Sequence, residues 1–187
     1  MRNLYHATYH SPVGKMILLA NENALLGVYF TGQKYFSMPE NSTFAPELPI
    51  LQKTREWLEK YFCGKTMIMA DIPLAPAGSS FRQLVWSLLR KIPYGLCVTY
   101  GDLAKKAASE MGKKFMSSQA IGGAVAHNPL SIIIPCHRVV GSKGALTGYA
   151  AGIAIKRQLL ELENCQIDEH GFYHKREKSL SPLVRYQ

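Results

Sequence analysis

Short apolar runs and polar turns alternate over the first third of the chain. The segment "GKMILLANENALLGVYF", residues 14–30, holds two apolar runs around the polar tripeptide "NEN", a pattern that predicts a β-hairpin. The segment "LQKTREWLEKYFCG", residues 51–64, has apolar residues at helical spacing and predicts an amphipathic helix closed by Gly64. The segment "DIPLAPAGSS", residues 71–80, is rich in proline and small residues, which is typical of a linker.

The pattern after this linker is helical. Ser80 and Gln83 fit a capping box at the start of a helix, and Thr99 with Asp102 is a second candidate. The first of these helices presents one apolar face, made by Phe81, Val85, Leu88 and Leu89. The sequence therefore predicts an α/β (α+β) protein, with an N-terminal sheet domain over residues 1–78 and a helical domain over residues 79–187.

Two short helices with a glycine between them suggest a helix-turn-helix. The first is "YGDLAKKAAS", residues 100–109, Gly112 lies in the break, and the second is "SSQAIGGAVAHN", residues 117–128, which Pro129 stops. Such pairs bind DNA, although they also occur in helical domains without that role. Gln119 is the only long polar side chain of the second helix before His127. If this helix meets DNA, we expect little sequence preference, because few side chains can reach base edges.

Positive charge is concentrated in the second part of the chain. Residues 1–78 carry 7 Lys/Arg and 6 Asp/Glu, whereas residues 79–187 carry 15 and 7, and the whole chain has a net charge of +9. A basic field of this kind attracts polyanions, of which nucleic acid is the first candidate. The alternative is a basic, solvated surface with no partner.

Composition and cysteine usage limit the possible classes. The chain has 187 residues and is 47% hydrophobic and 19% charged, as expected for a globular protein. No apolar run approaches the ~20 residues of a membrane helix, and the segment "MRNLYHATYHSPVGK" has no apolar signal core. We therefore expect a cytoplasmic protein without a membrane partner. The cysteines show no CxxC pair, so we expect free thiols.

The most reactive candidate is a cysteine followed directly by a histidine. Cys136 and His137 end the apolar run of "NPLSIIIPCHRVV". A cysteine is a strong nucleophile only as the thiolate, so a nearby group must accept its proton. Adjacent side chains usually diverge, so a water bridge or a turn at Pro135 would be needed to link the pair. A buried cysteine is otherwise an ordinary small core residue.

Two charged residues fall on the apolar side of a later helix. In "GIAIKRQLLELE", residues 152–163, Lys156 and Glu163 lie within the arc of isoleucines and leucines. They are about 10 Å apart along the helix axis, too far for a salt bridge, so each needs its own partner unless both side chains extend to solvent from the helix ends. Glu163 acting on His137, and His137 acting on Cys136 through water, would form a sensible relay.

The chain here resembles a known family. "IPCHRVVGSKGALTGYAAGIAIKRQLLELE" is similar to the active-site region of the O6-alkylguanine–DNA alkyltransferases, and its Pro-Cys-His-Arg-Val signature is highly specific. The resemblance extends through "GSSFRQLVWSLLRKIPYG", "TYGDLA" and "IGGAVAHNP", and more weakly to "SPVGKMILLANENALLGVYF". It implies a ribonuclease H-like N-terminal domain and irreversible transfer of an alkyl group from O6 of guanine, or O4 of thymine, to Cys136.

The resemblance also implies roles for individual residues. His137 and Glu163 would activate Cys136, Tyr100 would donate a proton to the departing base, and Asn128 would tie the helix-turn-helix to the active-site loop. The guanine pocket would be lined by Val139, Tyr149, Ala150 and Lys156. The DNA contacts would come from Ser118, Gln119, Ala120, Gly123 and Arg138. The damaged nucleotide would rotate out of the duplex, and each protein molecule would act once, as a monomer.

The sequence departs from the family at the recognition helix. The family usually places an arginine there to fill the gap left by the rotated base, and this chain has Gln119. We expect no cofactor and no metal, because His6, His10 and Cys63 show no ligand pattern. His6 and His10 are interpreted as marking the exposed edge of a strand.

Three other functions compete with alkyl transfer. A non-catalytic protein that binds alkylated DNA would lack the acceptor cysteine, and Cys136 is present. A cysteine hydrolase would need an oxyanion hole and repeated turnover. A sequence-specific regulator is disfavoured by the small side chains of the predicted recognition helix.

Overall fold

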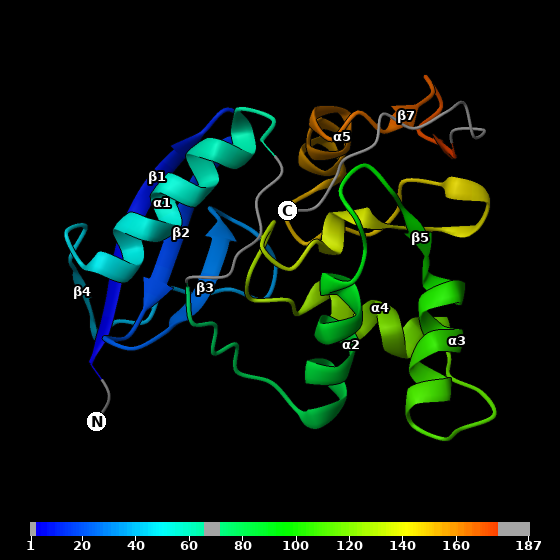
Figure 1. Cartoon of the computed structure of the whole chain (residues 1–187), viewed down its shortest axis with the longest axis horizontal. Coiled ribbons are helices and arrows are strands. Elements are labelled where there is room, and N and C mark those ends of the chain that lie inside the picture. Colours follow the sequence, from blue (N-terminus) through cyan, green and yellow to red (C-terminus); the bar gives the residue numbers. More distant parts are fainter. Residues whose placement is uncertain (1–2, 66–71, 176–187) are drawn as a thin grey trace, which may run out of the picture.

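A sheet domain lies beside a helical domain in the computed structural model of the chain (Figure 1), which describes residues 3–65 and 72–175. This arrangement confirms the predicted α/β class and the order of the two domains. The predicted linker, residues 71–80, is described from Ile72 onward, and the part of the predicted second domain after residue 175 lies outside the described residues.

Four strands form the N-terminal sheet. They are β1 (Leu4–Ser11), β2 (Gly14–Ala20), β3 (Leu25–Phe30) and β4 (Ser42–Phe44), in the order β3-β2-β1-β4. The predicted hairpin is confirmed as β2 and β3, which pair antiparallel. The side chain of Asn21 closes their turn by accepting hydrogen bonds from the backbone N–H groups of Asn23 and Ala24, at 2.8 and 2.7 Å.

Strand β1 is an inner strand, which corrects the interpretation of His6. It pairs antiparallel with β2 and parallel with β4, and His6 lies between Leu19 and Phe44 in this register. His6 therefore does not mark an exposed sheet edge, because the short strand β4 covers it.

Helix α1 (Pro49–Phe62) packs across one face of the sheet (Figure 1). Its buried face includes Leu51 and Leu58, which meet sheet residues such as Leu18 and Phe30 in one core cluster. Gly64 follows the helix with a φ of +74°, a backbone conformation that favours glycine. The predicted helix and its end are thus confirmed.

The C-terminal domain begins with helix α2 (Ser80–Arg90). Its cap is one residue earlier than predicted: Ser79 has extended backbone angles and accepts a 3.4 Å hydrogen bond from the N–H of Arg82. Ser80 is already helical, so the predicted Ser80–Gln83 box does not form. The buried indole of Trp86 donates to the carbonyl of Ala124 at 2.9 Å, which locks α2 against helix α4 (Ser118–Ala126).

The helix-turn-helix consists of α3 (Tyr100–Glu110) and α4. Thr99 caps α3 as predicted, since its hydroxyl accepts from the N–H of Asp102 at 3.0 Å and donates to that residue's carboxylate at 2.7 Å. Ser117 caps α4 through the N–H of Ala120. Gly112, with a φ of +64°, lies in the break between the two helices.

The rest of the domain consists of short elements around one helix. The two-residue strand β5 (Val98–Thr99), directly before α3, pairs parallel with β6 (Val139–Val140). Strand β6 lies between the 3₁₀ turns η1 (Cys136–Arg138) and η2 (Ser142–Gly144). Helix α5 (Ile153–Leu162) and the hairpin β7 (Gln166–Ile167) and β8 (Tyr173–His174) follow. Because the strands run parallel, the start of α3 lies next to the segment that leads from β6 into η2.

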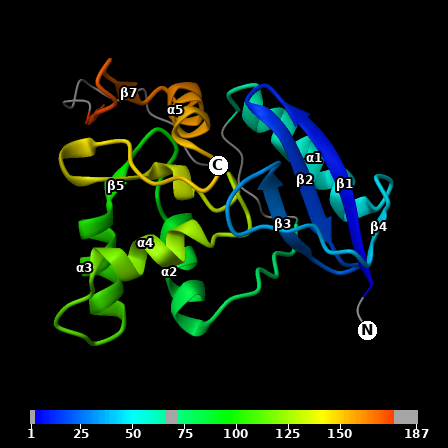
Figure 2. The same cartoon turned by 180° about the vertical axis from the view of Figure 1, so that it is seen from behind.

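The two domains meet along strand β3, which faces the helical domain in both views (Figures 1 and 2). The N–H of Val28 donates to the carbonyl of Pro129 at 2.8 Å, and the N–H of Ser131 donates to the carbonyl of Val28 at 2.9 Å. Leu130, between them, is fully buried. The segment that leads to Cys136 is therefore held by the edge of the N-terminal sheet.

Candidate active site

The apolar run before Cys136 is core rather than pocket wall. Ile132, Ile133 and Ile134 are all buried, and the N–H of Ile134 bonds back to the carbonyl of Leu130 at 2.8 Å. Ile132 has a φ of +72°, rare for a β-branched residue, so the chain turns sharply here. This anchored turn places Cys136 at the first position of η1 and buries it to 5% exposure.

Asn128 connects the end of the recognition helix to this turn. Its side-chain amide donates to the carbonyl of Ile134 at 2.8 Å and to the sulfur of Cys136 at 3.0 Å. Its carbonyl oxygen accepts from the N–H of Leu130 at 3.0 Å. A donor aimed at sulfur stabilises the thiolate more than the thiol, because the thiolate is the better acceptor.

The environment of Cys136 opposes ionisation in the absence of substrate. Burial raises the pKa of the Cys136 thiol, and the hydrogen bond from Asn128, the charge of Lys156 and the hydroxyl of Tyr149 only partly offset that rise. The thiol therefore needs a nearby group that accepts its proton before the thiolate can form.

His137 has the correct neighbours for a base but does not contact the thiol directly. Its Nε2 lies 2.8 Å from Oε1 of Glu163, and its Nδ1 is buried without a hydrogen-bond partner. Burial lowers the pKa of His137 against the opposing effect of Glu163 and so favours the neutral ring. An ionised carboxylate only accepts, so the proton is on Nε2 and Nδ1 carries the free lone pair.

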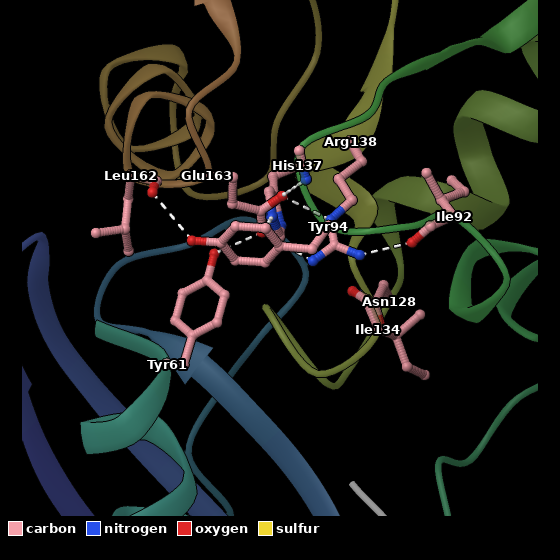
Figure 3. A network of polar contacts seen from close by, with 10 residues as sticks. Tyr61, Ile92, Tyr94, Asn128, Ile134, His137, Arg138, Leu162 and Glu163 are labelled. Atoms are coloured by element: carbon pink, nitrogen blue, oxygen red, sulfur yellow. Dashed lines mark hydrogen bonds and ion pairs between the residues drawn. The ribbon is translucent and has the colours of Figure 1, made fainter. Parts of the chain in front are cut away.

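Glu163 is the centre of a buried network (Figure 3). It caps the C-terminus of α5 and is 1% exposed. Burial raises the pKa of Glu163, but His137 and Arg138 outweigh this effect and hold that pKa far below its ordinary value. Oε1 accepts from Tyr61, His137 and Arg138 at 2.8, 2.8 and 2.9 Å, and Oε2 accepts from Arg138 and the N–H of Gly95 at 2.8 and 3.2 Å.

Lys156 is also buried and has separate partners. Its ammonium donates to the carbonyls of Val139 and Thr147 at 2.6 and 2.7 Å. Burial lowers the pKa of Lys156 to about 8. The alternative in which Lys156 and Glu163 extend to solvent is therefore wrong, since both are at most 1% exposed.

Two tyrosines lie near the thiol and interact with it electrostatically. The hydroxyl of Tyr100, at the first position of α3, donates to the carbonyl of Gly148 at 3.1 Å, and burial raises its pKa to about 12. The buried hydroxyl of Tyr149 interacts electrostatically with Cys136, and its pKa is raised well above the ordinary value, chiefly by burial. Ala150 is half-buried, and its carbonyl accepts from the N–H of Lys34 at 3.0 Å.

The predicted DNA-contacting residues divide into two groups. Ser118, Gln119, Ala120 and Gly123 are all exposed on α4. Arg138 is not on that surface: it donates to Glu163 and to the carbonyl of Ile92, and its guanidinium lies 5.7 Å from the ring centre of Tyr94. Its side chain is 11% exposed. We therefore correct the expectation for Arg138, because its donors are engaged inside the protein.

Two models of one protein family match this chain. The family model described as "6-O-methylguanine DNA methyltransferase, DNA binding domain" matches residues 80–165, and the model of the family's "ribonuclease-like domain" matches residues 4–76.

The chain belongs to the 6-O-methylguanine DNA methyltransferase family.

Relatives in this family match most of the chain. A methylated-DNA–protein-cysteine methyltransferase of Haemophilus influenzae is 39% identical over 171 residues, which are 91% of this chain and 92% of that protein. A protein of the same name from Methanosarcina acetivorans is 40% identical over 86% of this chain and 98% of its own length. A crystal structure of Mycobacterium tuberculosis OGT in complex with DNA superposes with a TM-score of 0.75 at 35% identity, covering 85% of this chain and 92% of that one.

Sequence reasoning missed several members of the site. Tyr61 of the N-terminal domain and Gly95 contribute to the Glu163 network, and Tyr94 donates to the carbonyl of Leu162 at 3.0 Å. Tyr61 is 102 residues from Glu163 in sequence, so no local pattern could have paired them. Within the described ranges, no three His, Cys, Asp or Glu side chains form a metal-binding cluster, and no helix is long and apolar enough to cross a membrane.

Proposed function

We propose that this protein repairs DNA by moving an alkyl group from O6 of guanine, or O4 of thymine, to the sulfur of Cys136, once per molecule. The observation that carries this proposal is the thiol of Cys136, which is buried beside the donor Asn128 and backed by the His137–Glu163 pair. Relatives named methylated-DNA–protein-cysteine methyltransferase support the reaction class.

Activation of the thiol begins with its proton. His137 presents a lone pair on a buried Nδ1 that has no hydrogen-bond partner. A water molecule between Nδ1 and the sulfur can carry the proton to the ring, where the negative charge of Glu163 stabilises the imidazolium that forms. The thiolate then attacks the alkyl carbon, the carbon–oxygen bond breaks, and a thioether forms on Cys136.

The departing guanine takes the electron pair of the broken bond and needs a proton. Tyr100 lies near Cys136 and is protonated at neutral pH, since its pKa is about 12. We assign to Tyr100 the donation of this proton, and to Val139, Tyr149, Ala150 and Lys156 the lining of the pocket. The two carbonyls held by Lys156 belong to Val139 and Thr147, so its charge also fixes the shape of this pocket.

The exposed stripe of α4 supports the DNA partner. Its small residues let the helix backbone approach a duplex closely, with Gln119 as the long side chain able to enter the base stack. The crystal structure of Mycobacterium tuberculosis OGT in complex with DNA supports the same partner. A DNA substrate and a reduced acceptor thiol together support a cytoplasmic site of action.

The intact mass of the protein tests this function. After incubation with a duplex containing O6-methylguanine, we expect a permanent gain of one methylene, about 14 Da, on Cys136 and on no other residue. The Cys136→Ser variant should gain nothing and still bind the duplex with an affinity within about twofold of wild type, because its phosphate contacts are unchanged. Repeated turnover without a mass gain would show a hydrolase instead, and binding without any reaction would show a recognition module.

A further inference from the structure

One side of α4 carries a stacked aromatic pair at its C-terminal end. Gln119, Gly123 and His127 recur at intervals of four residues and therefore share one side of the helix. His127 caps the C-terminus of α4, and its Nδ1 lies 2.7 Å from the carbonyl of Gly123, which keeps the ring on that side. The ring of Tyr35, from the N-terminal domain, stacks on His127 with the ring centres 4.1 Å apart and the planes at 23°.

Tyr35 is held in an unusual and exposed position. It is 64% exposed, and its φ of +63° is costly for a large side chain. Such strain persists only where the surrounding structure imposes it, and it is concentrated at functional sites. An aromatic ring presented to solvent at this conformational cost is a candidate contact for another molecule.

The segment that carries Tyr35 is anchored on both sides. Gln33 is 6% exposed, and its side-chain oxygen accepts from the N–H of Phe30 at 2.9 Å and from the hydroxyl of Ser131 at 3.3 Å. The N–H of Lys34 donates to the carbonyl of Ala150 at 3.0 Å, while the Lys34 side chain is exposed. In both views the chain after β3 turns toward the helical domain (Figures 1 and 2). Lys34 and Tyr35 are thus presented in a fixed place beside α4.

The open surface along α4 determines which partner fits. A side-chain carbon added at Gly122 or Gly123 would meet nothing within 4 Å, so the helix surface between Gln119 and His127 is low and unobstructed. Tyr35, with Lys34 before it in the chain, lies at the C-terminal end of α4, next to this exposed helix surface. A duplex lying on the α4 surface between Gln119 and His127 would place its sugar–phosphate backbone against the Tyr35 ring and the Lys34 charge. These groups complement deoxyribose and phosphate.

We propose that Lys34 and Tyr35 of the N-terminal domain form part of the DNA-binding surface and contact the sugar–phosphate backbone at the C-terminal end of α4. This inference rests on the proposed function, and it extends the DNA contacts from the helix-turn-helix to the other domain. His127 is the positioning residue, because its ring stacks on one face of the Tyr35 ring.

Substitution of Tyr35 by glycine tests the contact without adding strain. Glycine adopts a φ of +63° at little cost, so Tyr35→Gly removes the ring and leaves the backbone relaxed. The affinity for a duplex containing O6-methylguanine is measured in the Cys136→Ser background, where no transfer follows binding. We expect Tyr35→Gly to weaken binding by about fivefold or more, as loss of an aromatic nucleic-acid contact does. Lys34→Ala should reduce the slope of log K against log salt by about 0.9.

Phe44 provides a matched control. It is also an exposed aromatic residue of the N-terminal domain, at 59%, and also packs on a histidine, His6, with ring centres 5.5 Å apart. It lies on β4, at the edge of the sheet opposite β3. The Phe44→Ala variant should bind the duplex within about twofold of its parent.

A second assay separates binding from support of the pocket. Transfer from the free base O6-benzylguanine to Cys136 needs no duplex, so Tyr35→Gly should leave its rate unchanged while duplex repair slows. Equal slowing of both reactions would overturn the proposal, since Tyr35 would then act on the pocket through Lys34 and Ala150. Unchanged duplex affinity in Tyr35→Gly would also overturn it. A wild-type protein that takes no alkyl group from either substrate would instead disprove the proposed function.

Discussion

Glu163 shows how one buried carboxylate can serve both stability and chemistry. Its two oxygens accept five hydrogen bonds, from Tyr61, Gly95, His137 and, twice, Arg138. A buried charge is tolerated when its lone pairs are satisfied in this way. The same charge holds the proton of His137 on Nε2 and leaves Nδ1 with a free lone pair. Glu163, which we propose orients His137 as the base, therefore also links α5, η1 and helix α1.

Replacing this charge should affect rate and stability together. Glu163→Gln leaves Arg138 buried without its counter-charge and allows His137 to change tautomer. We expect transfer to slow by about 10²-fold and the free energy of unfolding at neutral pH to fall by about 3–5 kcal/mol. Stopped-flow transfer kinetics and urea denaturation measure the two effects.

Tyr61→Phe is the control for this prediction, because it removes one hydrogen bond to Glu163 and keeps the charge. It should cost about 1 kcal/mol of stability and leave transfer at least about ten times faster than in Glu163→Gln. A wild-type rate in Glu163→Gln would exclude Glu163 from the mechanism.

The pH dependence of stability follows from the same residue. The pKa of Glu163 is lower in the folded protein than the ordinary value of about 4.3. Its stabilising contribution is therefore complete above that ordinary value and is lost as the pH falls further. The difference in unfolding free energy between wild type and Glu163→Gln should accordingly shrink between about pH 5 and pH 3. A difference that stays constant over this range would contradict the assigned direction of the shift.

The pKa of Lys156 should limit the rate of alkyl transfer at high pH. Its positive charge lowers the pKa of Cys136, but its own pKa is about 8. Transfer from O6-benzylguanine should rise with pH as the thiolate forms and then flatten above about pH 8, where Lys156 loses its charge. Lys156→Met should be slower by about tenfold at neutral pH and should lack this flattening. The exposed Lys105 provides the control as Lys105→Met, and persistence of the flattening in Lys156→Met would assign it to another group.

At the scale of elements, α4 combines a packed side and a bare side. Ile121, Ala124 and Val125 are buried against the other helices, while glycine and alanine keep the opposite side low. Its N-terminus is capped by Ser117 and its position is fixed by the indole of Trp86 on the carbonyl of Ala124. Gln119 is the long side chain on the bare side, so we expect the length and charge of the residue at position 119 to control how well a base is displaced from the duplex.

Arginine at position 119 should strengthen duplex binding. Gln119→Arg adds a positive charge near phosphates and a longer side chain for the vacated base position. We expect tighter binding at low salt, a salt slope steeper by about 0.9, and faster duplex repair with little change toward free O6-benzylguanine. Gln119→Ala should slow only the duplex reaction. If it slows both reactions equally, Gln119 supports the pocket and does not fill the gap left by the base.

At the scale of the whole molecule, the N-terminal domain acts as a support for the active site. The bridge from Val28 to the segment 129–131 and the hydrogen bond from Tyr61 to Glu163 both cross the domain boundary. The acceptor segment is thus held by residues from the other domain. Such extensive contacts favour cooperative unfolding of the two domains.

One tryptophan in each domain makes this cooperativity measurable. Trp57 lies on α1 and Trp86 on α2. Denaturation of Trp57→Phe and of Trp86→Phe, each followed by its remaining tryptophan, should give curves in which far-UV circular dichroism and fluorescence coincide. Adding Leu130→Ala, which opens a cavity at the boundary, should lower stability by about 2–5 kcal/mol for both probes. If Leu130→Ala shifts only the Trp86 signal, the domains unfold independently.

The local structure and the main chemical candidates could be predicted from the amino-acid sequence. Apolar periodicity, polar turns and capping residues act over a few positions, so the β2–β3 hairpin, the helix ending before Gly64 and the Thr99 cap were all readable. The lone charges of Lys156 and Glu163 on an apolar helix face were readable for the same reason.

The partners of these charges come from distant parts of the chain and are known only from the three-dimensional packing. It assigned Lys156 to two backbone carbonyls, and it turned Arg138 inward to Glu163 and away from the DNA surface. It also brought Tyr61 to Glu163 and Tyr35 to His127 across the domain boundary. These contacts depend on how the sheet domain packs on the helical domain. Pairing between residues about a hundred positions apart leaves no periodic pattern in the chain, because it is determined by packing rather than by local spacing.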